Sequence, residues 1–298
     1  MTQEGHSEKF FTEERNYWYN SDFLTLMAKR WGLNKYKTLL DVGSGQCHWS
    51  KLLVPYLKGP ATITAADADK KWSMGSESIK SFFNMHNASV EFVRTDAHQL
   101  PFKDDSFDVV TCQTVLIHLK NPQQALKEMK RVVKSGGLII CAEPNSRIQY
   151  LIQNSLSVGD SISETLENVK YGLAYEMGKI KSGDGNNSFG DLLAEAFYET
   201  GLTNIQSYLN DKTIPLLPPY DTPEQKATLV NHEPENTYKP DSGEAKYFNV
   251  LGEEYTKFFE RKAKENLDDD FMNSIRSQKF MRGGATMMYL VSGQKSAS

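Results

Sequence analysis

The segment that most constrains the fold runs from Thr38 to Ser50, with the sequence Thr-Leu-Leu-Asp-Val-Gly-Ser-Gly-Gln-Cys-His-Trp-Ser. Its short apolar run is typical of a buried strand, which Gly43 and Gly45 bring to an end. The next apolar residues recur at helical spacing, at Trp49, Leu52, Leu53 and Tyr56. The segment therefore predicts a strand, a tight glycine turn and a helix, the first unit of a doubly wound α/β sheet.

A turn of this kind brings bare backbone close to a ligand, because glycine has no Cβ. The helix that follows supplies unpaired N–H groups and a partial positive charge. A dinucleotide site needs a small residue at the position of His48, and a carboxylate at Asp41 would repel a pyrophosphate. A dehydrogenase is therefore a distant alternative, and Asp41 suits a ligand that carries a cationic or ammonium group.

The same turn resembles the first motif of class I S-adenosylmethionine-dependent methyltransferases, an acidic residue followed by x-Gly-x-Gly-x-Gly. The match has one departure, because Cys47 stands where the third glycine is usual. The resemblance implies S-adenosylmethionine as cofactor, bound here by Asp41, Gly43, Ser44 and Gly45.

Two further acidic residues follow predicted strands. Ala61 to Ala66 forms the second strand, and Asp67 after it lies where a doubly wound fold places the carboxylate that binds both ribose hydroxyls, beside Ala68. Val90 to Arg94 is a third strand. The next segment, Thr95 to Asp108, resembles the Asp-Ala-x-x-Leu-Pro-Phe-x-Asp-x-Ser-Phe-Asp segment of the small-molecule branch that includes the quinone-biosynthesis C-methyltransferases. This resemblance implies that Asp96 accepts from the adenine amino group while the Ala97 N–H meets a ring nitrogen.

The later elements complete a seven-stranded, mostly parallel, Rossmann-like sheet with helical cap insertions. Predicted strands lie at 107–114, 138–142, 203–209 and 286–292, and the resemblance implies that the last is antiparallel between the fifth and sixth. Gln113 lies near the carboxyl end of the fourth strand, where ligands bind in such sheets. The predicted parts are an N-terminal helical lid at 1–35, the cofactor-binding core at 36–145, a helical insertion at 146–188, core at 189–210, a helical cap at 211–284, and the last strand with the tail at 285–298.

Aromatic residues gather in the N-terminal segment, where one or two amphipathic helices are predicted between Phe10 and Trp31, ending at Gly32. Two interpretations of Tyr17 and Tyr19 stay open. They pack a helix on the sheet, or they contact substrate in a lid, as the N-terminal helices of similar methyltransferases do.

Two residues are candidates for a catalytic base. His118 follows the fourth strand, and histidine titrates near working pH. Glu143 ends the fifth strand, with Asn145 close by as a candidate for orienting substrate. The alternatives are a structural histidine on a helix surface and two residues that only shape the turn at Pro144.

Composition limits the functional class. The 298 residues carry a net charge of −4 and no apolar run of about 18 residues, so no membrane span is predicted. The polar N-terminus lacks the apolar centre of a signal peptide, which favours a cytoplasmic protein. Three separated cysteines indicate neither a metal site nor disulfides, and no basic block interleaved with aromatic residues indicates nucleic acid.

The sequence therefore predicts a methyltransferase that acts on the oxygen, nitrogen or carbon of a small organic acceptor. One alternative is a protein or RNA methyltransferase, which an open groove would favour. Another is a non-catalytic S-adenosylmethionine-binding protein, suggested by the missing third glycine at Cys47. The acceptor, the pathway and the oligomeric state are left open.

Overall fold

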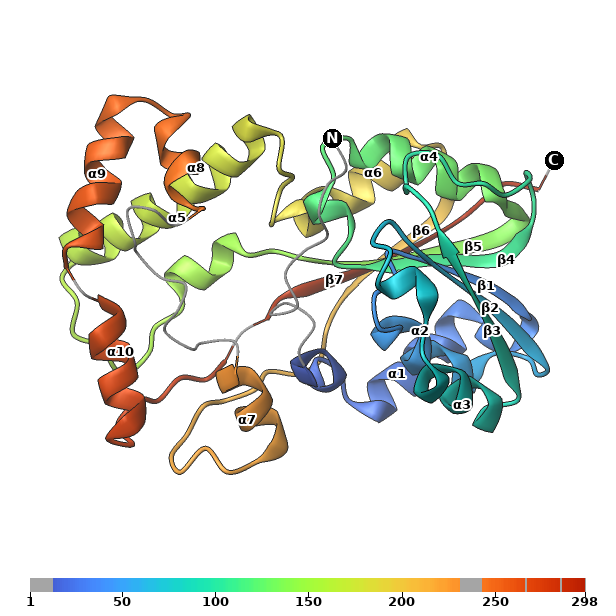
Figure 1. The fold of residues 1–298 in the computed structure, drawn as a ribbon, viewed down its shortest axis with the longest axis horizontal. Helices are drawn as coiled ribbons and strands as arrows, with labels where there is room; N and C mark the ends of the chain where they lie inside the picture. Colours follow the sequence, from blue (N-terminus) through green and yellow to red (C-terminus); the bar gives the residue numbers. More distant parts are fainter. Residues whose placement is uncertain (1–12, 231–242, 266, 285, 298) are drawn as a thin grey trace.

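A seven-stranded sheet forms the centre of the molecule in the computed structural model, which describes residues 13–230, 243–265, 267–284 and 286–297 (Figure 1). The strand order is β3-β2-β1-β4-β5-β7-β6, and β7 runs antiparallel to both of its neighbours. The predicted fold class and the position of the last strand are confirmed. The strands are β1 Thr38–Val42, β2 Ala61–Asp67, β3 Ala88–Arg94, β4 Phe107–Gln113, β5 Val133–Pro144, β6 Thr203–Leu209 and β7 Met288–Gln294.

Helices cover both faces of the sheet, because side chains of a strand alternate between its two sides. Leu39 of β1 packs in one apolar core with α1 Ser21–Trp31, α2 His48–Leu53 and α3 Glu77–Met85. Its neighbour Leu40 packs in the other, with α4 Pro122–Val132 and α6 Leu193–Glu199. Short 3-10 turns connect these elements: η2 Glu13–Tyr17, η3 Leu33–Lys35, η4 Val54–Tyr56, η5 Trp72–Met74, η6 Leu116–His118, η7 Arg147–Leu151 and η8 Phe189–Leu192.

The two insertions form a helical lobe beside the sheet, at the left of Figure 1. Its helices are α5 Ile162–Ser182, α7 Pro223–Val230, α8 Ala245–Asn249, α9 Glu253–Ala263 and α10 Leu267–Arg276. Phe248 and Phe259 stack with their ring centroids 4.7 Å apart in the small core shared by α5, α8 and α9. Among the described residues, no helix is long and apolar enough to span a membrane.

In the sequence, Ser161 and Glu164 have the spacing of a capping box and apolar residues from Ile162 to Ile180 form one helical stripe, which predicts a helix here. Helix α5 begins with this box, in which Ser161 and Glu164 satisfy each other's backbone N–H groups. The stripe, however, is exposed: Ile162 is 81% accessible and Met177 57%. The helix packs through another face instead. A Cβ added at Gly178 would lie 1.9 Å from the Tyr247 carbonyl oxygen, so α5 and α8 approach at backbone distance.

Several predicted boundaries differ from the structure. The sequence predicts that the helix from Pro122 to Val133 ends at Gly136 and Gly137. These glycines lie within β5 instead, because Val133 already pairs with Phe107 of β4. The sequence also predicts helices at 189–200 and 271–280. The first is divided between η8 and α6, and the second is α10, which begins earlier and ends at Arg276. Residues 1–12, including Phe10 and Phe11 of the predicted lid, lie outside the described residues, as does Asn266.

Candidate cofactor and active site

The glycine turn after β1 has the close backbone approach that the sequence predicts. Gly43 has φ +66°, and a Cβ there would lie 2.4 Å from Cγ2 of Val115. Gly45 is also left-handed, with φ +49°. Cys47 takes the same region with φ +60°, at the cost of roughly 1 kcal/mol that a glycine would avoid. The turn therefore keeps its left-handed third position although the residue is not glycine.

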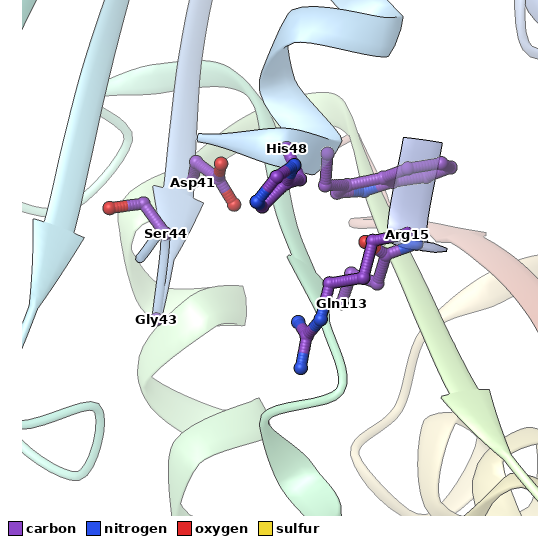
Figure 2. Close-up of a pocket in the computed structure, with 7 residues that line it drawn as sticks. Arg15, Asp41, Gly43, Ser44, His48 and Gln113 are labelled. Carbon is purple, nitrogen blue, oxygen red and sulfur yellow. The ribbon is translucent and has the colours of Figure 1, made fainter. Parts of the chain in front are cut away.

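A small pocket lies at this turn (Figure 2). It is lined by Arg15, Asp41, Gly43, Ser44, His48, Trp49 and Gln113. Asp41 is the last residue but one of β1, with only 1% of its surface exposed. Burial raises the pKa of its carboxyl to about 7, although hydrogen bonds from Ser50 oppose the shift. The pocket therefore holds a buried acid that is close to half-ionised at neutral pH.

Three buried polar atoms of residues that line this pocket make no hydrogen bond to any residue that the structure describes: Asp41 Oδ2, Ser44 Oγ and His48 Nε2. Buried polar groups are almost always paired, because an unpaired one costs about 1–3 kcal/mol. Because all three residues line one pocket, they fit a polar ligand with both a cationic and a hydrogen-bonding end.

Asp67 ends β2 and joins the turn to its neighbouring strand. Its Oδ2 accepts from the Gly45 N–H at 2.9 Å, and its Oδ1 accepts from the Asp69 N–H at 2.9 Å. Burial raises the pKa of Asp67, while these backbone N–H groups oppose the shift. Ala68 is the next residue along the chain, on the exposed side of the strand end.

Asp96 lies one strand further along the same edge. The Thr95 N–H donates to the Asp67 carbonyl at 2.9 Å, which brings the two acidic segments together. Asp96 Oδ1 accepts from the His98 backbone N–H at 2.8 Å. Partial burial raises the pKa of Asp96, but hydrogen bonds from His98 outweigh it and hold the value below its usual range. Asp41, Asp67, Asp96 and Ala97 thus follow three neighbouring strands, as the sequence predicts.

Tyr19 contacts two residues that line the pocket, Gln113 and Trp49. Gln113 Nε2 donates to the Tyr19 hydroxyl at 3.1 Å, and the centroid of the Tyr19 ring lies 5.6 Å from that of Trp49. Tyr19 is only 5% exposed, and burial strongly raises its pKa. Tyr17 is half-buried, with Lys212 Nζ 5.8 Å from its ring centroid. Of the predicted substrate tyrosines, Tyr19 therefore lies behind the pocket lining and Tyr17 lies nearer the surface.

The two candidate bases have different surroundings. Glu143 is fully buried, and its Oε1 accepts from the N–H groups of Val115 at 3.0 Å and Leu116 at 2.9 Å. Burial raises the pKa of Glu143 to about 7. His118 ends η6 in a half-buried position. Glu143 thus holds the backbone of the segment that carries His118.

Asn145 joins the end of β5 to two neighbouring turns. Its Nδ2 donates to Asp191 Oδ1 at 2.8 Å, and its Oδ1 accepts from the Arg147 N–H at 2.9 Å. Both polar atoms of the side chain therefore support the loops that lead to the helical lobe.

Three pocket residues, Arg15, His48 and Trp49, were not among the predicted ligands. Arg15 donates from Nη1 to Thr114 Oγ1 at 2.8 Å, and burial lowers its pKa. In the sequence, the size of His48 argues against a dinucleotide site, but no pattern there predicts that it binds a ligand. No local pattern marks Arg15, because it lies in a polar N-terminal stretch far from the motifs.

The sheet order, with β7 antiparallel beside β5, and the acids at successive strand ends define a class I S-adenosylmethionine-dependent methyltransferase domain. Residues 40–141 match the family described as "Methyltransferase domain". These residues, about a third of the chain, are therefore similar to that class, whose cofactor is S-adenosylmethionine.

Curated relatives match the same region. Demethylmenaquinone methyltransferase of Staphylococcus aureus (strain MRSA252) is 35% identical over 118 residues, 39% of this chain and 47% of the relative. The enzyme of the same name from Staphylococcus haemolyticus (strain JCSC1435) is 37% identical over 105 residues, 35% of this chain and 42% of the relative. The chain thus spans about half the length of the curated relatives it matches.

Solved structures support the fold over a longer stretch. A candidate methyltransferase from Bacillus halodurans C-125 superposes with a TM-score of 0.52 at 16% identity, over 93% of this chain and 100% of that one. The YcgJ protein from Bacillus subtilis superposes with a TM-score of 0.53 at 16% identity, over 94% of this chain and 100% of that one. At this identity the likeness establishes the fold.

Proposed function

We propose that the protein transfers a methyl group from S-adenosylmethionine to a small organic acceptor. The observation that carries the proposal is the set of unpaired buried atoms on Asp41, Ser44 and His48, at the glycine turn of a methyltransferase core. When bound, S-adenosylmethionine would supply an electrophilic methyl carbon on its sulfonium. In-line attack of the acceptor on this carbon would release S-adenosylhomocysteine. The residues proposed to hold it are Asp41, Gly43, Ser44, Gly45, Asp67, Ala68, Asp96, Ala97 and Gln113.

The chain's own contribution is to orient the reactants and exclude water. In the proposal, Asp67 accepts from the ribose hydroxyls and Asp96 from the adenine amino group. His118 is the proposed base, since its half-buried imidazole follows β4 at the ligand-binding edge of the sheet. Complete burial favours a positioning role for Glu143, through its hydrogen bonds to the backbone of η6.

The acceptor proposed is small, aromatic and quinone-like, because the matching relatives are named demethylmenaquinone methyltransferases. The aromatic residues of the insertions add little to this argument. Tyr171, Tyr175 and Phe248 pack together in the core of the helical lobe, and Tyr198 is 76% exposed on α6. The atom that accepts the methyl group is left to the acceptor assay.

A non-catalytic cofactor-binding protein is the second candidate. It is favoured by one observation, the strained left-handed Cys47 at the third glycine position. Methyl transfer to any acceptor would exclude it. A methyltransferase that acts on protein or RNA is a further outcome of the same assay, if macromolecular acceptors are included.

The first experiment is calorimetric binding of S-adenosylmethionine, S-adenosylhomocysteine and NAD. Wild type is expected to bind the first two and not NAD. Asp67→Asn is expected to weaken binding by roughly tenfold or more, because the ribose loses a charged acceptor. Asp69→Asn, a matched control two residues away, keeps the ionised acceptor at Asp67. Failure of wild type to bind either sulfur compound would remove the basis of the proposal. Radiolabelled methyl transfer to a prenylated naphthoquinol then tests the acceptor class.

A further inference from the structure

His48 is the first residue of α2, and its ring is held from one side. Nδ1 lies 3.0 Å from Oδ1 of Asn16 in η2. An amide oxygen only accepts hydrogen bonds, so Nδ1 must carry the proton in this pair. The neutral imidazole then has its lone pair on Nε2. Asn16 therefore makes Nε2 a hydrogen-bond acceptor.

The protonated form of the ring is disfavoured here. Burial, together with the smaller effect of the positive charges of Arg15 and Lys51, lowers the pKa of His48 to about 4. The ring is thus neutral over the ordinary working range of pH. Nε2 is buried, belongs to a residue that lines the pocket, and makes no hydrogen bond within the described part of the chain. The group that fits there is a donor.

The charges around the pocket give the chemistry of that donor. Asp41 contributes an acid whose Oδ2 is also unpaired, and Figure 2 shows the His48 ring between Asp41 and Arg15. A cationic donor satisfies both Nε2 and the Asp41 carboxylate. The guanidinium of Arg15 favours an anion beside it. A free amino-acid end carries both groups on one carbon.

We infer that His48 is a cofactor-binding residue, whose Nε2 accepts a hydrogen bond from the α-ammonium group of the cofactor's methionyl end, while Arg15 attracts the α-carboxylate. The inference rests on the proposed function and adds to it the residues that recognise the amino-acid end of the cofactor. Arg15 and Asn16 both belong to η2, so this N-terminal turn takes part in recognition: Arg15 acts directly, and Asn16 acts by fixing the tautomer of His48.

The test compares two ligands that differ only at the inferred contact. S-adenosylhomocysteine has the amino-acid end, whereas 5′-methylthioadenosine keeps the adenosine and the thioether without it. His48→Phe retains the size of the ring but not the acceptor. We expect it to weaken S-adenosylhomocysteine by roughly tenfold or more and to leave methylthioadenosine within about twofold. His86→Phe, at the end of α3, is the matched control and should change neither affinity.

A second variant guards against disturbed folding at the buried His48. Asn16 is exposed, so Asn16→Ala leaves the core intact. It removes the acceptor that holds the proton on His48 Nδ1, so either ring nitrogen can carry the proton. We expect the ¹⁵N shifts of His48 to indicate a single Nδ1–H tautomer in wild type and a mixture in Asn16→Ala, with a selective loss of S-adenosylhomocysteine affinity.

Equal losses for both ligands, or no loss for either, would overturn the role of His48 and leave the proposed function standing. If wild type bound neither ligand, the proposed function would fall, and this inference with it.

Discussion

Asp41 is the residue whose ionisation depends most on what fills the pocket. Its carboxyl has a pKa of about 7 in the ligand-free protein because it is buried. A cationic ligand favours the carboxylate and lowers that pKa. We expect binding of S-adenosylhomocysteine at neutral pH to release up to about half a proton. Calorimetry in buffers of different ionisation enthalpy measures this number, and a heat independent of the buffer would contradict it.

His118 and Glu143 can be separated by paired amide substitutions. His118→Gln removes the proposed base and is expected to lower kcat by about 10²-fold or more, with unchanged S-adenosylhomocysteine affinity. Glu143→Gln keeps an oxygen that can accept from Val115 and Leu116, so kcat should fall by less than about tenfold. Steady-state kinetics on the acceptor found above give both values. The reverse order of effects would assign the base to Glu143.

For single residues, the sequence predicts the positions of the acidic side chains better than that of the basic residue Arg15 in the same pocket. Asp41, Asp67 and Asp96 follow strands that a buried apolar run reveals, so their common edge can be inferred. Arg15 could not be found in this way. It reaches the pocket because α1 packs on the sheet and brings η2 back to Thr114, a contact 99 residues apart in sequence. Such placement comes from tertiary packing, which no local spacing encodes.

Among the elements, the contact between α5 and α8 depends on a missing side chain. Gly178→Ala would place a Cβ 1.9 Å from the Tyr247 carbonyl oxygen, so the two helices must separate. We expect a loss of about 1–3 kcal/mol in the free energy of unfolding. Gly159→Ala, where an added Cβ meets nothing within 4 Å, is the control. Denaturant titration measures both, and equal stabilities would show that α5 adapts to the extra methyl.

Strands and helices differ in how well the sequence predicted them. Six strands were predicted within two residues of their observed bounds, whereas β5 begins five residues before the predicted 138. Burial explains this for β1 and β4, whose residues are almost all buried, but the edge strands β3 and β6 are largely exposed or half-buried. The glycines at 136 and 137 were wrongly assigned to a helix end, since glycine is equally suited to the first residues of β5. The stripe of α5 predicted a helix correctly, but a periodic pattern does not say whether its apolar face is covered.

The whole molecule should lose stability as the pH rises. Asp41 and Glu143 both have pKa values near 7, raised by burial above those of an unfolded chain. The native state therefore binds these protons more tightly, and stability present at low pH is lost as the pH passes about 7. Acids with lowered pKa values, such as Glu128, act in the opposite sense, but their gain is complete at more acid pH. His48, whose pKa is lowered to about 4, also adds stability as the pH rises, but it offsets only one of the two acids and only up to about pH 6.5.

We expect the free energy of unfolding to fall by on the order of a few kcal/mol between about pH 5 and pH 8 in the protein without ligand. The melting temperature should fall with it. Saturating S-adenosylhomocysteine should reduce the fall, because it favours ionised Asp41. Calorimetric scans across this range, with Asp41→Asn as control, test the expectation. A melting temperature that rose steadily with pH would contradict it.

The antiparallel position of β7 also has a consequence during synthesis on the ribosome. The five parallel strands are complete once Pro144 has emerged, but β5 pairs next with Met288–Gln294. At ribosomal rates, the intervening chain takes on the order of 10 s to appear. Until then β5 presents an open edge able to pair with another nascent chain. Production of this protein should therefore respond more to growth temperature and chaperone supply than the finished sheet, in which β5 is paired on both sides, would suggest.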